Sequence, residues 1–388
     1  MPRLGRLLLI TFVESLTTTL IERGVYFYTH DQLSFSDTEN LWLALAFGVV
    51  YVAGALVSHP LAARLGERPL LLATLVGLLA THAALWVWPA SPVLVVAAFA
   101  VVGGLNGLKW PIIESYVSAG RTPAAQVAAV GRFNLAWSTA VVLGLAMAGP
   151  LIVWESASLF AAAVVLGLVS LVIVWPIARH PAHMAPDHPD RPSAGAMARY
   201  SSLLGASRTT MLASYSLMWI LAALMPTVFT TLGVTVAVAP ALASLLDVCR
   251  VLAFLTLQLW PRWHNRRWPV VVVMVGLPAG FAMALFGTNL ATVLAGEIVF
   301  GLSAGLTYYA ALYYAMVVKN ASVEAGGAHE GFIGAGFAIG PAAGLVGRAL
   351  APAVGGAVLG MVVGVGPVVV GCLALAAVHL ARTVKRES

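Results

Sequence analysis

Ionisable side chains within apolar stretches are the residues of this sequence best suited to chemistry. Glu14 and Glu22 interrupt the first apolar run, and Lys109 interrupts a later one. An ionised side chain at the centre of a lipid-embedded helix costs at least about 2.5–3.5 kcal/mol, so such a residue usually has a partner or a task. These positions therefore mark the first candidates for a functional site.

Glu14 and Glu22 stand eight residues apart, which places them about 80° apart on a helix, with Thr18 between them. A carboxyl group shielded from water favours its protonated form and can load and release a proton near physiological pH. We therefore expect proton coupling at Glu14 first and at Glu22 second. The alternative for Glu22 is a position near the outer membrane interface, where it would extend to the headgroups beside Arg23.

Asn106 and Lys109 recur at helical spacing, and the depth of Lys109 in its helix matches that of Glu14. An ammonium and a carboxylate at one depth can neutralise each other, which lowers the cost of burying both. A substrate or a proton would compete for this pair, or the pair would be a permanent structural salt bridge. Glu114 and Arg132 flank the next loop, and we expect them to form a second pair that bridges two helices or latches a gate.

Further polar and aromatic residues are candidates for the wall of a substrate cavity. They are Asn134, Trp137, Trp219, Tyr308 and Tyr309. An acidic and aromatic lining suits an organic cation or a polyol, and the sequence does not choose between them. Asp247 and Arg250, three residues apart, can pair along one helix face. We expect a second structural pair between Glu297 and Arg348, and a helix-capping role for Glu330.

The elements that position these residues follow from composition. Of the 388 residues 60% are hydrophobic and only 9% are charged, whereas a soluble domain has about 25% charged residues. Most of the surface must therefore face lipid, and the predicted fold is an all-α membrane protein of twelve transmembrane helices. The expected spans are 7–29, 41–62, 69–89, 92–117, 126–151, 156–178, 205–231, 235–260, 268–288, 290–318, 329–350 and 355–381.

A single polar segment divides the chain into two apolar parts of nearly equal length. We expect a six-helix bundle over 1–178, a cytoplasmic loop over 179–203 and a second six-helix bundle over 204–388. The parts resemble each other: Gly103 and Gly107 align with Gly301 and Gly305, and at nearly the same offset Pro69 aligns with Pro269. Two matches at one spacing indicate a duplicated, pseudo-symmetric unit.

The charges set the expected orientation. Basic residues gather in alternate loops, as at Arg64, Arg68 and Arg121, and by the positive-inside rule these loops and both termini are cytoplasmic. The formal charge of +6 therefore reflects membrane topology and does not indicate a nucleic-acid partner. The two cysteines lie in apolar segments and predict no disulfide framework. We expect no metal and no cofactor.

The loop SHPLAARLGERPLL at Ser58–Leu71 resembles the signature of the major facilitator superfamily, with Arg64, Gly66 and Arg68 at matching positions. GFAIGPAAG at Gly336–Gly344 resembles a glycine-proline signature of the family's antiporters, although it falls on the eleventh helix. The resemblance covers the whole chain. It implies alternating access to a central cavity lined by helices one, four, seven and ten.

These features predict a secondary active transporter that moves a small organic solute across a bacterial inner membrane, driven by protons. We expect it to act as a monomer in the lipid bilayer. A GxxxxGK[ST] loop for direct ATP use is absent from the sequence. The alternative is a membrane protein that uses this fold for sensing or assembly without transport. A membrane enzyme is disfavoured, because the sequence offers no nucleophile and base constellation.

Overall fold

The computed structural model describes residues 4–118, 120–121, 123–181, 194–319 and 323–384, and all regular structure within them is helical. The first part of the chain comprises α1 (Leu4–Glu22), α2 (Gly24–Gln32), α3 (Asp37–Leu65), α4 (Glu67–Val87), α5 (Pro92–Ser118), α6 (Pro123–Trp154) and α7 (Ser158–Val174). The second part comprises α8 (Ala194–Thr231), α9 (Ala239–Ala243), α10 (Leu245–Leu259), the 3₁₀ turn η1 (Pro261–Trp263), α11 (Trp268–Phe286), α12 (Leu290–Lys319), α13 (Val323–Val354) and α14 (Ala357–Val384).

Within the described residues, eleven helical segments are long and apolar enough to cross a membrane. Ser158–Val174 is a shorter apolar helix, and it lies where the sixth of the twelve predicted spans is expected. The joined helices α1 and α2 form one of these segments, Leu4–Gln32, and α9 with α10 form another, Ala239–Leu259. The all-helical membrane fold predicted from composition is therefore confirmed.

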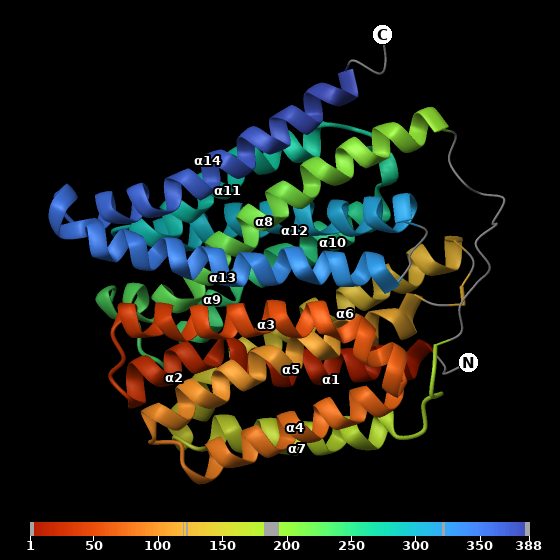
Figure 1. The fold of residues 1–388 in the computed structure, drawn as a ribbon. Coiled ribbons are helices and arrows are strands. Elements are labelled where there is room, and N and C mark those ends of the chain that lie inside the picture. Colours follow the sequence, from red (N-terminus) through yellow and green to blue (C-terminus); the bar gives the residue numbers. More distant parts are fainter. Residues whose placement is uncertain (1–3, 119, 122, 182–193, 320–322, 385–388) are drawn as a thin grey trace.

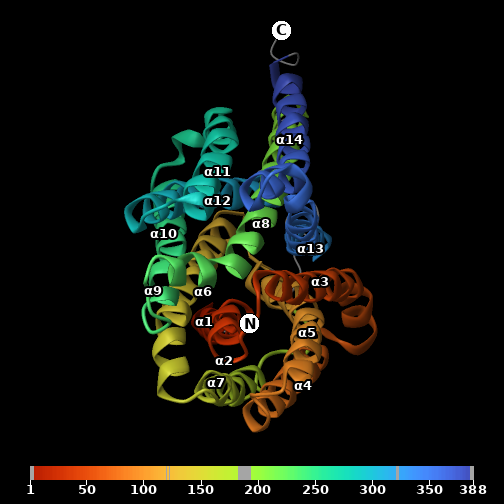
Figure 2. The same ribbon diagram turned by 90° about the vertical axis from the view of Figure 1, so that its left-hand side faces the viewer.

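The helices fall into two groups that pack mainly within themselves. In the first group α3 packs on α5, α1 on α6 and α4 on α7, and in the second α11 packs on α12 and α13 on α14. Figure 1 shows the first group below the second, with α3 and α13 side by side where they meet. Figure 2 shows the same stacking from one end of the helices. We call these groups the first half and the second half.

Local sequence explains where α3 begins and ends. Ser36 and Glu39 form a capping box: the Ser36 hydroxyl accepts a hydrogen bond from the Glu39 backbone N–H at 3.3 Å, and the Glu39 carboxylate accepts one from the Ser36 backbone N–H at 2.7 Å. Gly66 ends the helix with φ +92°, a conformation that costs glycine little. The next helix begins one residue later, so α3 and α4 form a tight hairpin that exposes Arg64.

Glycines set the closest helix contacts in both halves. A Cβ atom on Gly103 of α5 would lie 2.5 Å from the Phe47 carbonyl oxygen of α3. In the second half, Gly301 and Gly305 bring α12 against the backbone of α10 at Leu246 and Arg250. The fourth span thus packs on the second span in the first half, and the tenth on the eighth in the second half. This equivalence agrees with the internal repeat seen in the sequence.

Several helices begin earlier than expected. α8 begins at Ala194 and not at 205, and α13 begins at Val323 and not at 329. A helix can continue out of the lipid, where polar residues satisfy its surface, and hydropathy detects only the lipid-embedded part. The consequence is that Glu330 lies two turns inside α13 rather than at its first turn.

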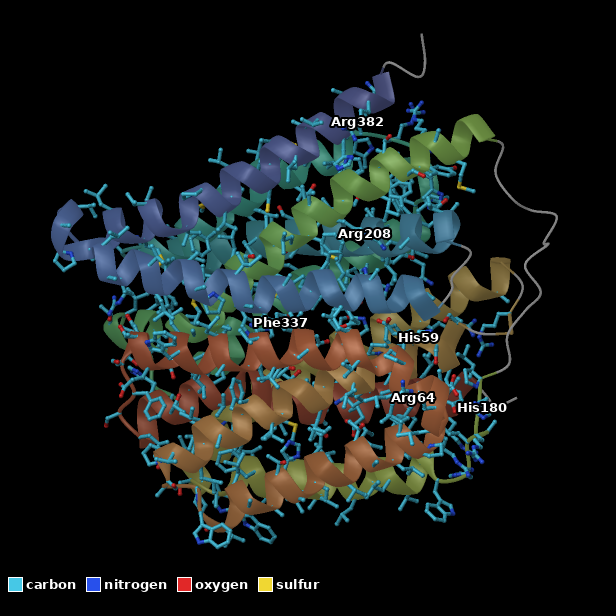
Figure 3. The ribbon with its side chains drawn as sticks, in the orientation of Figure 1. His59, Arg64, His180, Arg208, Phe337 and Arg382 are labelled. Carbon is cyan, nitrogen blue, oxygen red and sulfur yellow. The ribbon has the colours of Figure 1, made fainter. Side chains whose placement is uncertain are left out.

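Both ends of the described chain lie at one end of the molecule, which we call the termini side (Figure 1). Here Arg68 donates a hydrogen bond to the Ile177 carbonyl oxygen at 3.0 Å, and the Tyr116 hydroxyl donates one to the Ala178 carbonyl oxygen at 2.7 Å. His180 contacts the Glu67 carboxylate at 2.6 Å. Figure 3 shows His180 at the same side as Arg382. The basic loop after α3 therefore holds the start of the central segment.

Polar contacts join the halves at the other end, which we call the far side. Asp37 of α3 accepts a hydrogen bond from Thr227 of α8 at 2.5 Å and pairs with Arg348 of α13 at 3.3 Å. His30 contacts Thr230 at 3.4 Å. The pairing expected between Glu297 and Arg348 is wrong, because the Arg348 side chain reaches across the seam to Asp37. These contacts join the two halves at the far side.

Candidate functional site

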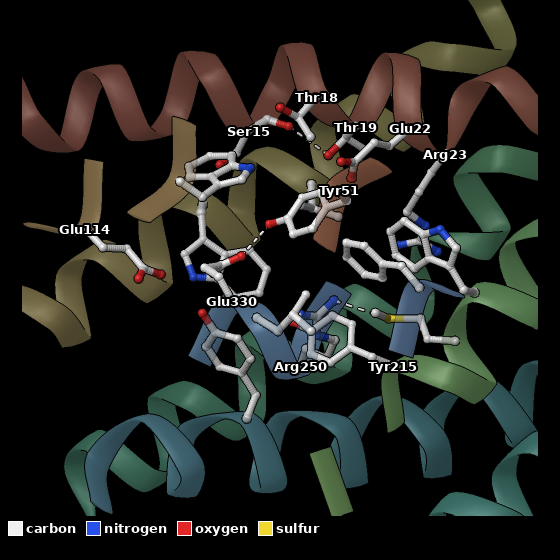
Figure 4. Close-up of a pocket in the computed structure, with 18 of the residues that line it drawn as sticks. Ser15, Thr18, Thr19, Glu22, Arg23, Tyr51, Glu114, Tyr215, Arg250 and Glu330 are labelled. Carbon is white, nitrogen blue, oxygen red and sulfur yellow. Dashed lines mark hydrogen bonds between the residues drawn. The ribbon is translucent and has the colours of Figure 1, made fainter. Parts of the chain in front are cut away.

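A cavity lies between the two halves and contains several of the polar groups that the sequence singled out (Figure 4). The first half contributes Ser15, Thr18, Thr19, Glu22, Arg23, Tyr51, Trp110, Glu114, Phe133, Trp137 and Val141. The second half contributes Tyr215, Met218, Trp219, Arg250, Tyr308, Glu330, Ile333 and Phe337. Helices one, four, seven and ten of the predicted order all take part, as α1, α5, α8 and α12.

A chain of polar contacts runs through the first half beside this cavity. Lys109 Nζ lies 2.8 Å from a Glu14 carboxylate oxygen and donates a hydrogen bond to the Thr18 hydroxyl at 2.9 Å. Thr18 donates to the Asn106 amide oxygen at 3.5 Å, and the Asn106 amide nitrogen donates to Glu22 at 3.3 Å. All five side chains are buried. The predicted contact between Glu14 and Lys109 is thus present, and it lies away from the cavity, whereas Glu22 faces it.

A cluster of charges connects the halves toward the far side. Arg23, between α1 and α2, pairs with Asp247 of α10, and Asp247 also accepts a hydrogen bond from Arg250 at 2.8 Å. The predicted Asp247 and Arg250 pair is therefore formed, and no pattern in the sequence indicated that Arg23 joins it. Glu297 of α12 lies buried beside Arg23 in a smaller cavity of about 300 Å³. We call Arg23, Asp247 and Arg250 the arginine cluster.

Two carboxyl groups meet across the seam on the other side of the cavity. Glu114 of α5 interacts directly with Glu330 of α13, and the Tyr51 hydroxyl of α3 donates a hydrogen bond to Glu330. Figure 4 shows the Tyr51 hydroxyl directed at Glu330. The predicted pair of Glu114 and Arg132 is wrong, because Arg132 is exposed on the surface of α6. We call Glu114 and Glu330 the acid pair.

Aromatic rings form much of the cavity wall. Trp219 and Phe337 stack with their centroids 3.8 Å apart, and Trp137 packs on Tyr308 at 5.2 Å. The Arg250 guanidinium lies 4.8 Å from the centre of the Trp137 ring. A guanidinium over an indole face is an attractive arrangement. The wall therefore offers ring faces to a ligand.

Two predicted cavity residues lie behind this wall. Asn134 is buried and accepts a hydrogen bond from the Trp137 indole nitrogen at 3.0 Å, so it fixes the orientation of that ring. Tyr309 packs on Phe254 and Trp263, with centroids 5.9 and 6.0 Å away. In contrast Tyr308, one residue earlier, faces the cavity.

The sequence reasoning missed several residues that the structure places in the cavity. They are Tyr51, Trp110, Tyr215, Glu330 and Phe337. Tyr51 belongs to the second span, which the family resemblance did not mark as cavity wall. The start of α13 was predicted too late in the sequence, so Glu330 was expected in the first turn. With the correct start, Glu330 is a carboxyl group two turns inside an apolar helix, which marks it as a candidate site residue.

Residues 7–345 match the family described as Major Facilitator Superfamily. Because this match covers most of the sequence, the chain belongs to the major facilitator superfamily. No curated protein matches the sequence significantly.

Solved transporter structures share the fold. A bacterial homologue of the human lysosomal transporter Spinster, in an inward-facing and unoccupied conformation, is 15% identical, with 99% of this chain and 96% of that chain covered and a TM-score of 0.66. The nucleoside transporter NupG is 13% identical, with coverages of 97% and 99% and a TM-score of 0.67. A peptide transporter, POT, in complex with sulfate is 12% identical, with coverages of 99% and 94% and a TM-score of 0.72. The family and these structures indicate a membrane transporter rather than an enzyme.

Proposed function

We propose that this protein is a secondary active transporter that moves a small organic solute by alternating access and couples the movement to protons. A cavity between two packed halves, lined by polar and aromatic side chains from both of them, supports this function. The two halves would tilt about their seam and expose the cavity to each side of the membrane in turn.

The observation that carries proton coupling is the polar chain from Glu14 to Glu22. Glu22 has no cation among its described hydrogen-bond partners and receives only the neutral Asn106 amide, at 3.3 Å. Burial without an ionic partner favours the protonated form of a carboxyl group. Glu22 is therefore the proton-binding residue at the cavity. Glu14, held by Lys109 at 2.8 Å, is the second residue that we propose for proton coupling, and the contacts of Thr18 and Asn106 connect it to Glu22.

The orientation in the membrane follows from the charges. The termini side carries Arg68, His180 and Arg382, and the positive-inside rule assigns such a side to the cytoplasm. The protein would lie in a bacterial inner membrane as a monomer, with halves over 1–178 and 204–388. Residues 182–193 of the central segment lie outside the described part of the chain.

Proteoliposomes with a trapped pH-sensitive dye test this function. Sugars, nucleosides, amino acids and organic cations are added in turn, and a coupled substrate produces a solute-dependent change of internal pH. Glu22→Gln keeps the shape of the side chain and removes its ionisation, so we expect it to reduce the solute-dependent proton flux. Glu155→Gln is the matched control, because Glu155 is exposed in the turn after α6.

Two results would contradict the proposal. If Glu22→Gln supports the same proton flux as the unmodified protein, Glu22 does not carry the proton. If a solute binds the purified protein but never exchanges across the membrane in counterflow, the protein is a sensor or an assembly factor on this fold and not a transporter.

A further inference from the structure

The acid pair gives the cavity an excess of negative charge that the proposed function does not use. Glu330 is 4% exposed and Glu114 is half-buried, and the two come from opposite halves. Among the described side chains that line the cavity, the cations Arg23 and Arg250 are engaged by Asp247, and Lys109 beside the cavity is engaged by Glu14. Two carboxyl groups in direct contact cannot both be ionised at low cost, so they must share a proton or hold a cation.

Titratable groups from four other helices face the acid pair. They are Glu22 of α1, Tyr51 of α3, Tyr215 of α8 and Tyr308 of α12. The Tyr51 hydroxyl donates a hydrogen bond to Glu330 and so stabilises one negative charge there. Glu22 adds a further negative charge whenever it is ionised. None of these groups therefore supplies a positive charge to the acid pair.

Two buried polar groups of the cavity wall also have no partner. The Ser15 hydroxyl oxygen and the Trp219 indole nitrogen make no hydrogen bond within the structure, although both side chains are about 97% buried and both line the cavity. An unsatisfied buried polar atom costs about 1–3 kcal/mol, so each marks a place where a ligand atom would bind favourably. Ser15 can accept a hydrogen bond from a ligand, and Trp219 can only donate one.

The rest of the wall is aromatic and apolar. Trp137, Tyr308 and Phe337 present rings to the cavity, and such faces attract organic cations as well as apolar groups. No group of three or more His, Cys, Asp or Glu side chains in the described part of the chain could hold a metal ion. An organic cation therefore fits this site better than a metal ion does.

We propose that the transported solute is an organic monocation whose ammonium group binds between Glu114 and Glu330 in exchange for the proton that these carboxyl groups share. This assignment rests on the transporter function proposed above. The aromatic or aliphatic body of the solute lies against Trp137, Tyr308 and Phe337. A hydrogen-bond acceptor at its far end receives the Trp219 indole N–H.

The exchange balances in charge. Before binding, the acid pair and its shared proton carry one negative charge in total. On binding, the O–H bond of the protonated carboxyl group breaks, the proton leaves to solvent, and the ammonium forms N–H hydrogen bonds to both carboxylates. The occupied site again carries one negative charge, so the exchange leaves the net charge of the cavity unchanged and adds no further charge to a medium of low dielectric constant.

Isothermal titration calorimetry with three related phenols tests this inference on the purified full-length protein. Tyramine carries an ammonium group, 4-ethylphenol is its neutral counterpart, and 3-(4-hydroxyphenyl)propionate is its anionic counterpart. We expect tyramine to bind at least about tenfold more tightly than either counterpart, a difference of about 1.4 kcal/mol. Titrations in buffers of different ionisation enthalpy count protons, and we expect tyramine to release about one proton.

Variants assign the effect to the acid pair. Glu114→Gln and Glu330→Gln should each weaken tyramine binding by about tenfold or more and suppress proton release, whereas Glu155→Gln should change neither. Tyramine binding no tighter than 4-ethylphenol, including no binding by either, overturns the inference without the use of any variant. Full proton release in the Glu114→Gln and Glu330→Gln double variant overturns it as well.

The two proposals can fail separately. If tyramine binds with proton release but no solute drives proton flux in proteoliposomes, the transport proposal fails and the cation site stands. If a sugar or a nucleoside drives proton flux and tyramine does not bind, the transport proposal stands and the cation site fails.

Discussion

Asp247 should control the closure of the far side. Its carboxylate is 1% exposed and is shared by Arg250 of the same helix and by Arg23 of the opposite half. The contact with Arg250 persists when the halves separate, whereas the contact with Arg23 exists only while the far side is closed. Asp247→Asn therefore removes an interaction that favours the closed far side.

The magnitude follows from the burial of the pair. Removal of one partner of a fully buried ion pair costs about 3–5 kcal/mol. The Arg23 side chain is 10% exposed and borders the cavity, so water screens part of this energy. About 1.4–2.7 kcal/mol then remains for the closed state, which corresponds to a shift of about 10- to 100-fold toward an open far side.

Cysteine labelling measures this shift. Ala222 is 5% exposed and lines the small cavity that contains Arg23, so Ala222→Cys in a Cys249→Ala and Cys372→Ala background reports on far-side opening. We expect Asp247→Asn to raise the rate of labelling by a membrane-impermeant maleimide at least about tenfold. In an Arg23→Gln background Asp247→Asn should raise the labelling rate little further, because the contact between Arg23 and Asp247 is already lost.

An unchanged labelling rate in Asp247→Asn would refute the reasoning. So would an equally large effect of Asp247→Asn with and without Arg23, because the energy would then come from Arg250 or from a general loosening of the fold.

Two further predictions concern stability. Glu14→Gln or Lys109→Met alone should lower the free energy of unfolding by about 3–5 kcal/mol, because each leaves a buried charge unpaired. The double variant should recover most of this loss in thermal-shift measurements. A double variant as unstable as the single variants would contradict a simple ion pair. Gly103→Ala should lower the free energy of unfolding by about 1–3 kcal/mol, since its Cβ would lie 2.5 Å from the Phe47 carbonyl oxygen. Gly366→Ala is the matched control, because a Cβ atom there meets no atom within 4 Å. Equal melting temperatures of the Gly103→Ala and Gly366→Ala variants would contradict the close packing.

Properties that repeat along the chain could be predicted from the sequence. The apolar runs and the polar break gave the helical membrane fold, and spacing along one helix gave the Asp247 and Arg250 pair. Matched depth in two helices gave the Glu14 and Lys109 pair. Each of these follows from a period or a distance within one half of the chain.

Properties that depend on how helices rotate and dock could not be predicted. Depth alone suggested that Arg132 would meet Glu114, but α6 turns Arg132 outward and α13 brings Glu330 to Glu114 instead. The sequence placed Arg23 near the membrane interface, and only the docking of the second half on the first half brings Asp247 of α10 to it. Apolar stretches of nearly uniform hydrophobicity carry little information about which face of a helix points inward.

The line where α3 meets α13 has a consequence for any rocking motion. Backbone packs against backbone there, with Gly48 beside Phe337, and one turn along, Gly334 lies beside Tyr51. Such a contact can serve as a fulcrum. Leu65, at the end of α3, lies about 25 Å from Gly48, so a tilt of about 10° would move this end by about 4 Å. Tyr51 and Glu330 lie close to this axis and would hardly separate in such a tilt, so a solute bound at Glu330 would stay in contact with both halves while the two ends of the seam open and close.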